Sequence, residues 1–309
     1  SSGEYMSIKN LRFYTVDTGD INYILKNDTA IEEKLNEVAF RPCAKDELSS
    51  VGFVPVFDGT DALHFSSGDN HFFKVAEEAK ILPSSTVKRE VKNVILVKEN
   101  ELKRTLKKSE KDAIKAAVAN KLLSQALTSY KEFLIWLNPK EKIVGVATTS
   151  AKKAEGAIAL LRAAFTTFPA QLLSPQTMPE LVMTEWLKNP LTLPEIFHFG
   201  NDTTLKSSDE DGATIKASKE DLTSEEISIH LESKVVKEIS LHYDITADIK
   251  LTSDLVIKSF KPVDLYLEKT LPEKSDNPVA DAQALLIIEA DILASLCPKL
   301  LEVFKCKVN

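Results

Sequence analysis

Apolar and polar positions in the first quarter of the chain alternate between strand-like and helix-like patterns. They predict a strand, a helix and two further strands, over residues 8–16, 28–40, 51–57 and 71–76. Pro55 falls in the second of these strands, and proline cannot donate a ladder hydrogen bond. That strand is therefore predicted at an edge or an end of a small first sheet.

After residue 80 the apolar positions recur every three or four residues, which is typical of helices. Ser84 or Ser85 is predicted to cap a first helix, and Ser109, which has Asp112 three residues later, is predicted to start a second. The apolar stripes are narrow, with Val87, Val91, Val94 and Ile95 in the first helix and Ile114, Val118, Leu122 and Leu123 in the second. A narrow stripe leaves the other faces in water. The pattern thus predicts an exposed helical hairpin.

Two apolar runs around a short polar loop, at 133–137 and 143–148, predict a β-hairpin. Ser150 then precedes an alanine-rich segment and predicts a capped helix. The side chains expected on its buried stripe are Ala154, Ile158, Leu161 and Phe165.

The last third of the chain is predicted to contain a sheet and a long helix. A proline-punctuated connection should hold a short strand at 180–184 and a short helix at 185–188. A strand is predicted over 213–217. A capping box of Thr223 and Glu226 predicts the start of a helix, whose Ile227 and Leu231 should point inward. An antiparallel meander is then predicted over 235–244, 247–252 and 255–260. A helix over 279–304 ends the pattern, and Pro298 is expected to kink or split it.

These elements predict an α+β protein with small mixed or antiparallel sheets, flanking helices and a protruding helical hairpin. Three domains are predicted. They are a central α+β domain of residues 6–79 and 133–175, a basic hairpin extension of residues 80–132, and a C-terminal α+β domain of residues 176–309.

Charge is distributed very unevenly along this chain. Residues 80–121 hold twelve Lys or Arg against five acids, a net charge of +7, whereas the whole chain carries −7. Residues 1–79 carry −7 and residues 166–309 carry −10. A row of basic residues at intervals of three to four can follow a phosphate backbone, and acidic surroundings would confine nucleic acid to that track. A solvated helix surface is the alternative explanation of the same charges.

The sequence contains few motifs that indicate catalysis, nucleotide binding or metal binding. Nine glycines form no G-x-G-x-x-G or G-x-x-x-x-G-K loop, and the three cysteines and five histidines show no metal-binding spacing. We therefore predict no catalytic residue, metal or cofactor, although carboxylates from separate elements could still assemble a metal-dependent nuclease. No secretion signal and no apolar run of membrane-spanning length is found, so we expect a cytoplasmic protein without a membrane partner.

Several motifs occur together in a fixed order. They are KNLRFY at 9–14, F-x-P-C at 40–43, G-F-V-P at 52–55, KILPS at 80–84, LKKSEKD at 106–112, SAKKAE with ALLR at 150–162, TEWL at 184–187 and KEDLTSEEI at 219–227. In these motifs and their spacing, from Met6 to the C-terminus, the chain resembles the RdgC family of bacterial recombination-associated proteins.

The resemblance implies a horseshoe-shaped subunit that pairs into a ring, whose positively lined hole takes duplex DNA without sequence preference. It also implies a protein that restrains RecA-promoted recombination and is not an enzyme. Arg104 and Lys219 match basic positions that line the hole. Gln125 to Leu127 stand where relatives have R-A-F at a dimer junction, and Glu220 stands where relatives have Gln. The first departure removes one basic contact and makes one aromatic contact aliphatic. Glu220 removes a neutral donor and adds negative charge beside the DNA path.

We therefore predict a homodimeric, nucleoid-associated protein that binds double-stranded DNA and affects the RecA filament indirectly, through DNA. The predicted DNA-binding residues are Lys88, Arg89, Lys92, Lys103, Arg104, Lys107, Lys108, Lys111, Lys115, Lys216 and Lys219. The predicted dimer interface contains Gln125 and Leu127. The alternatives are a regulator that docks on a recombinase filament and, less favoured, a metal-dependent nuclease.

Overall fold

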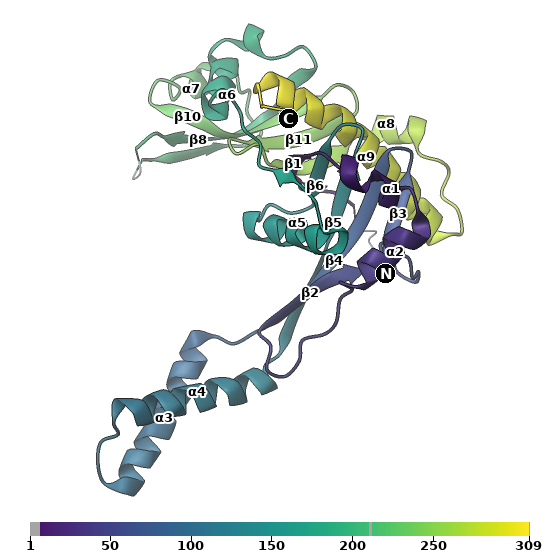
Figure 1. Cartoon of the computed structure of the whole chain (residues 1–309). Helices are drawn as coiled ribbons and strands as arrows, with labels where there is room; N and C mark the ends of the chain where they lie inside the picture. Colours follow the sequence, from purple (N-terminus) through teal and green to yellow (C-terminus); the bar gives the residue numbers. More distant parts are fainter. Residues whose placement is uncertain (1–6, 210–211, 309) are drawn as a thin grey trace. The chain divides into compact units, whose positions relative to one another are not determined.

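Two sheets and their associated helices make up this computed structural model, which describes residues 7–209 and 212–308 (Figure 1). The predicted α+β class is confirmed. The strands are β1 (Arg12–Val16), β2 (Ser49–Val54), β3 (His64–Ser67), β4 (Asn70–Lys80), β5 (Thr128–Asn138), β6 (Ile143–Val146), β7 (Ala170–Gln171), β8 (Phe197–Ser207), β9 (Thr214–Ala217), β10 (Lys234–Tyr243), β11 (Ala247–Thr252) and β12 (Ile257–Pro262). The helices are α1 (Asn22–Leu25), α2 (Asp28–Asn36), α3 (Ser84–Leu102), α4 (Lys108–Gln125), α5 (Ala151–Phe165), α6 (Pro179–Lys188), α7 (Glu225–Ser228), α8 (Asp264–Thr270) and α9 (Pro278–Val303).

The chain forms two compact units. The first unit contains the described parts of residues 1–37, 55–74 and 133–309, and the second contains residues 38–54 and 75–132. The long strands β4 and β5 each begin in one unit and end in the other. The three domains predicted from the sequence stay a prediction.

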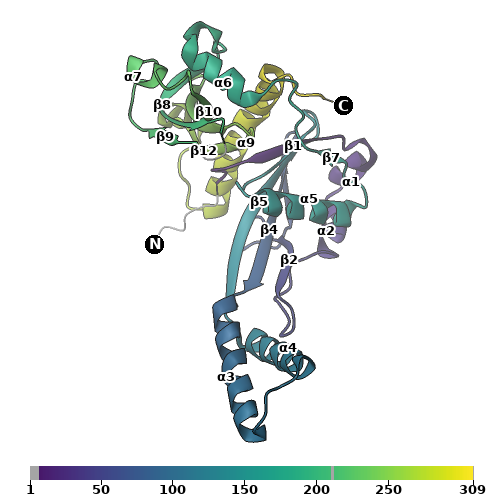
Figure 2. The same cartoon turned by 90° about the vertical axis from the view of Figure 1, so that its left-hand side faces the viewer.

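A five-stranded antiparallel sheet, in the order β12-β11-β10-β8-β9, lies in the first unit. It contains the predicted meander, whose alternating apolar residues are buried. The long helix α9 packs on it (Figure 2), with Leu293 and Leu296 in the same core as Ile239 and Leu251. This helix runs on to Val303, so the predicted split at Pro298 does not occur.

The other sheet has the order β2-β4-β5-β6-β1-β7, with β3 paired to β4. The predicted β-hairpin is confirmed as β5 and β6, which pair antiparallel. Helix α5 is confirmed with its cap, since the Ser150 hydroxyl accepts a hydrogen bond from the Lys153 backbone N–H at 3.2 Å. Its predicted stripe is buried, and Phe165 packs edge-on against Phe73 of β4.

Three local predictions for residues 180–228 need correction. Residues 180–184 belong to helix α6 and not to a strand, because Pro179 occupies the first helical turn and Met183, Trp186 and Leu187 recur at helical spacing on its buried side. The Thr223–Glu226 capping box does not form. Thr223 instead bonds Asp221 through both its backbone N–H and its hydroxyl, and α7 begins one residue later than expected. Ile227 and Leu231 are buried as predicted.

Strand β8 was not predicted, although it lies inside the sheet between β10 and β9. Its sequence includes Gly200, Asn201 and Asp202, which favour turns. A residue larger than glycine would clash at position 200, because its Cβ would lie 2.3 Å from the Ser240 hydroxyl oxygen of the neighbouring strand. A close approach of two strands therefore explains the glycine.

The second unit contains β2, the outer parts of β4 and β5, and the helices α3 and α4. Phe40 packs edge-on against Tyr130, with ring centroids 5.7 Å apart. The Lys80 ammonium group donates to the backbone carbonyls of Ala44, Lys45 and Leu123, which ties the start of the helical segment to its end. None of the helices that the structure describes has the length and apolar character required to cross a lipid bilayer.

Candidate nucleic-acid interface

Helix α3 carries the first group of predicted basic residues. Its apolar stripe, around Val87, Val91 and Val94, is half-buried, and none of its residues is fully buried. Lys88 and Lys92 are one turn apart and share a face, with Arg89 beside them, and all three side chains are exposed. The helix begins at Ser84, directly after Pro83, so the predicted serine cap does not form. It ends at Leu102, and Lys103 follows in the left-handed conformation with φ of 54°. Helix α3 therefore presents basic side chains to solvent along its first half.

Helix α4 carries the second group. It begins at Lys108, one residue before the predicted Ser109, because the Glu110 carboxylate accepts the backbone N–H of Lys107 and satisfies the first turn. Val118 and Leu123 are buried as expected, whereas Ile114 and Leu122 are half-buried. Three exposed lysines share one side of the first half of the helix, Lys108, Lys111 and Lys115. We call these three residues the α4 lysine row.

The loop that joins the two helices is held by one apolar anchor and one ion pair. Leu106 is buried, with 6% of its surface exposed, and its backbone N–H donates to the Glu99 carboxylate at 3.4 Å. Arg104 makes a two-point contact with Glu110, in which the two nitrogen-to-oxygen distances are 3.0 and 3.1 Å. This hydrogen-bonded pairing raises the pKa of Arg104 and lowers the pKa of Glu110. The charge of Arg104 is thus already balanced within the loop.

The other predicted basic residues of the helices differ from Arg104. Within the described residues, they form no ion pair, and their side chains are exposed: Lys88, Arg89, Lys92, Lys103, Lys107, Lys108, Lys111 and Lys115. Because these side chains are exposed, their ammonium and guanidinium groups are available to an external anion. The sequence did not predict that Arg104 is paired while the others are not. The pair with Glu110 depends on the conformation of the loop, which begins with the left-handed residue Lys103.

Lys216 and Lys219 lie in the first unit, and the structure describes them there. Lys216 is on β9 and faces solvent, and Lys219 follows this strand with φ of 56°. The backbone N–H of Lys219 donates to the Asp202 carboxylate at 3.1 Å. Burial opposes ionisation of Asp202, but hydrogen bonds from Lys219 and Ser218 and the charge of Lys250 leave its pKa lowered. Lys216 and Lys219 therefore stand in a mixed-charge surface, unlike the lysines of α3 and α4.

The predicted interface residues Gln125 and Leu127 lie where α4 meets β5. Both are exposed, and Leu127 has 79% of its surface in contact with solvent. The Leu127 carbonyl accepts the backbone N–H of Ile81 at 2.7 Å, and Ile81 is also exposed. Sequence reasoning missed Ile81, because an isoleucine between a lysine and a leucine-proline pair gave no signal of exposure. Leu127 and Ile81 together form an exposed apolar site in the second unit.

A protein metal site needs several ligands that converge on one point. Among residues 7–209 and 212–308 no group of three or more His, Cys, Asp or Glu side chains is arranged to hold a metal ion. The expectation that the protein uses no metal stays a prediction.

The fold and these surfaces define an α+β protein with two sheets and an exposed basic helix pair. Its sequence matches, over residues 6–307, the family model described as "Putative exonuclease, RdgC". The chain belongs to the RdgC family, and the resemblance noted from the sequence motifs is confirmed.

Several relatives of known name align with most of this chain. Proteins named recombination-associated protein RdgC from Yersinia pestis (strain Pestoides F) and Yersinia pseudotuberculosis serotype O:1b (strain IP 31758) are each 31% identical to it over 274 residues. The alignment covers 88% of this chain and 90% of each relative. The protein of the same name from Yersinia enterocolitica serotype O:8 / biotype 1B gives the same identity and coverage.

Proposed function

We propose that this protein binds double-stranded DNA without sequence preference through α3, α4 and the loop between them. The observation that carries the proposal is the group of exposed Lys and Arg side chains on these elements that have no ion-pair partner in the described part of the chain. Such groups bind phosphate by charge and release the condensed counterions of DNA. Contacts to phosphate carry no sequence information, so the binding would be independent of sequence.

The acidic remainder of the chain supports this choice of surface. Residues 1–79 and 166–309 carry net charges of −7 and −10. A polyanion is repelled by such segments and attracted by the +7 of residues 80–121. The charge distribution therefore favours one track for DNA over adsorption at many places.

We further propose that the working form is a homodimeric ring around duplex DNA, with Leu127 and Gln125 at one junction. An exposed leucine beside an exposed isoleucine is suited to a contact that excludes water. The junction would be aliphatic, because both of these side chains are aliphatic. Lys216 and Lys219 would add basic groups to the lining from the first unit.

The relatives are named for an association with recombination, and this directs the biological proposal. A ring that covers duplex DNA would restrain RecA-promoted recombination by occupying the DNA, without direct contact to the filament. The protein would then be cytoplasmic and associated with the nucleoid.

Charge reversal of the α4 lysine row tests the DNA-binding proposal. Changing Lys108, Lys111 and Lys115 to Glu should weaken the binding of a mixed-sequence duplex by roughly a hundredfold or more, since three phosphate contacts become repulsions. The control reverses three exposed lysines of the first unit, Lys152, Lys269 and Lys274, and makes the same change in net charge. Equal affinity of the two variants would contradict the proposal, and circular dichroism checks that both are folded.

A nuclease is the second candidate, because the family model is described as an exonuclease. Incubation of linear and supercoiled duplex with Mg²⁺ or Mn²⁺ distinguishes the two functions. The DNA-binding proposal predicts intact DNA, and shortening of the linear duplex would establish the nuclease.

A docking protein that contacts a recombinase filament directly is the remaining alternative. Capture of RecA from a nuclease-treated extract would support docking. Duplex binding without such capture would support the DNA-binding proposal.

A further inference from the structure

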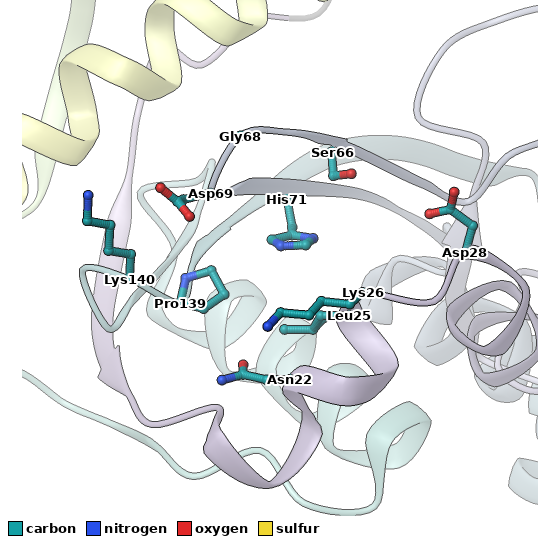
Figure 3. A pocket seen from close by; sticks show the side chains of 10 residues that line it. All are labelled: Asn22, Leu25, Lys26, Asp28, Ser66, Gly68, Asp69, His71, Pro139 and Lys140. Atoms are coloured by element: carbon teal, nitrogen blue, oxygen red, sulfur yellow. The ribbon is translucent and has the colours of Figure 1, made fainter.

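A polar pocket of about 410 Å³ lies in the first unit, between α1, the turn that joins β3 to β4, and the turn that joins β5 to β6 (Figure 3). Volumes of this order are typical of small-molecule sites. The pocket contains none of the basic residues assigned to DNA. It is therefore a feature that the proposed DNA contact does not explain.

A buried pair of histidines reaches the pocket through one member, since His71 lines the pocket and His64 does not. The His71 Nδ1 atom lies 2.8 Å from the His64 Nε2 atom, and the two rings are stacked with centroids 5.1 Å apart. Burial lowers the pKa of His64 to about 4 and also lowers the pKa of His71, so both rings are neutral at pH 7. The second ring nitrogen of His71, Nε2, makes no hydrogen bond to another described residue. This nitrogen is therefore available to a ligand bound in the pocket.

Two lysines line the same pocket. Lys26 follows α1 and Lys140 lies in the turn between β5 and β6, and neither forms an ion pair within the residues that the structure describes. In Figure 3 the Lys26 ammonium group lies between His71 and Asn22. The Asn22 side-chain oxygen already accepts from the Thr18 hydroxyl at 2.7 Å, so its amide NH₂ is the group left to donate.

Two carboxylates complete the lining. Figure 3 shows Asp69 and Lys140 on one side of His71 and Asp28 on the other. Carboxylates repel an anion but accept hydrogen bonds from hydroxyl groups, as in the recognition of a ribose. A ligand for this pocket therefore needs an anionic end for the donors and hydroxyl groups for the carboxylates.

We propose that this pocket binds a small phosphate monoester that carries hydroxyl groups, of the sugar phosphate or nucleoside monophosphate class. Lys26, the Asn22 amide and His71 Nε2 would hold the phosphate. Lys140 would join them by turning its side chain inward, since its ammonium group points away from His71 in Figure 3. Asp28 and Asp69 would accept the hydroxyl groups. Charge-assisted hydrogen bonds of ammonium to phosphate are among the strong polar contacts in proteins. DNA does not satisfy this site, because its internal phosphates are diesters within a polymer.

The histidine pair makes the site responsive to its ligand. A neutral imidazole has one N–H, so the pair has two arrangements of its protons. If His64 Nε2 donates to His71 Nδ1, the His71 Nε2 atom carries a proton and can donate to the phosphate. If His71 donates instead, its Nε2 atom is a bare acceptor. Bound phosphate selects the first arrangement. The shared proton then crosses from His71 Nδ1 to His64 Nε2, His64 releases its Nδ1 proton to solvent and His71 takes one up from solvent at Nε2, so the charge of the pair is unchanged.

Titration of the full chain with ribose 5-phosphate, followed by imidazole ¹H–¹⁵N NMR, tests the proposal. The His71 and His64 signals should shift and saturate, and ribose without phosphate should leave them unchanged. Lys26→Gln and Lys140→Gln should each weaken binding by about tenfold or more, since each removes one charge-assisted contact. Lys142→Gln is the matched control, because Lys142 lies in the same turn as Lys140 but does not line the pocket.

Two results would overturn the proposal. One is the absence of any histidine shift at about 10 mM ribose 5-phosphate, a concentration that fills most of a site with a Kd near 1 mM. The other is equal weakening by Lys142→Gln and Lys140→Gln, which would indicate general attraction to positive charge. Neither result depends on whether the chain binds DNA.

Discussion

At the scale of single residues, similar basic side chains have different surroundings. Arg104 is paired with Glu110, whereas the α4 lysine row is unpaired in the part of the chain that the structure describes. The sequence predicted a row of equivalent cations, and spacing along a helix does identify which residues share a face. It does not reveal a pair that forms across a loop, six residues apart. Arg104 is therefore expected to contribute less to DNA binding than its position suggests.

Release of Arg104 gives a direct test of this difference. Glu110→Gln should strengthen duplex binding a few-fold, because it frees the guanidinium group and removes one negative charge. Glu101→Gln on α3 makes the same change in net charge without releasing Arg104. Fluorescence anisotropy on a mixed-sequence duplex should show the larger gain for Glu110→Gln. Equal gains would mean that only net charge matters.

Glu289 is a residue whose ionisation should alter stability. It is buried in α9 and accepts the backbone N–H of Ile8 at 3.2 Å, and burial raises its pKa from 4.5 to about 8. Between these two pH values the folded state holds a proton that the unfolded state has lost. Rising pH therefore favours unfolding, by up to about 1.4 kcal/mol per pH unit from this group.

The variant Glu289→Gln should lack this contribution, so its stability relative to the unmodified chain should increase as pH rises from 5 to 8. Glu302→Gln near the end of the same helix is the control, since Glu302 is largely exposed. Urea unfolding at several pH values measures the difference. A pH-independent difference for Glu289→Gln would contradict a raised pKa.

At the scale of elements, the periodicity of apolar residues correctly predicted the helices and strands that have one buried face and one face in solvent. The hairpin β5–β6, the helix α5 and the meander are confirmed because their apolar positions repeat regularly. Helix α6 was divided into a strand and a helix, since LVMT alone is as apolar as a strand and its helical spacing becomes visible only over ten residues. Strand β8 was missed because its turn-forming residues are accommodated by a neighbouring strand, which the sequence cannot show.

The connection between α3 and α4 should depend on Leu106. Leu106→Ala removes the buried anchor of the loop and should destabilise the helix pair by about 2 kcal/mol. Leu102→Ala removes the same atoms from a side chain that is half exposed and should have a much smaller effect. Hydrogen exchange of the α3 and α4 amides checks this expectation. Similar exchange in the two variants would show that Leu106 does not anchor the loop.

At the scale of the whole molecule, charge and exposed apolar surface support the account of DNA binding and pairing. The excess of positive charge could be read from the sequence, and the structure adds that its side chains are exposed. The pairing of subunits stays a proposal, since it depends on a surface whose partner lies outside the chain. Gln125 and Leu127 were selected through the family resemblance and not through any pattern of their own.

The proposed junction predicts a change in molecular mass. Leu127→Asp should weaken the dimer by roughly tenfold or more, because a charge would replace an apolar contact in a desolvated site. Leu191→Asp, at a residue that is 93% exposed in the first unit, is the matched control. Light scattering across a range of concentrations gives the mass of each variant. A monomeric unmodified chain, or equal masses of both variants, would contradict the junction.

The most direct test of the central claim is the salt dependence of duplex binding. The logarithm of the association constant should fall linearly with the logarithm of salt concentration, with a slope of about −0.9 for each phosphate neutralised. Replacing the α4 lysine row with Gln should make this slope shallower by up to about 2.7, whichever duplex sequence is used. An unchanged slope in that variant, or binding of the unmodified chain that does not respond to salt, would contradict the account.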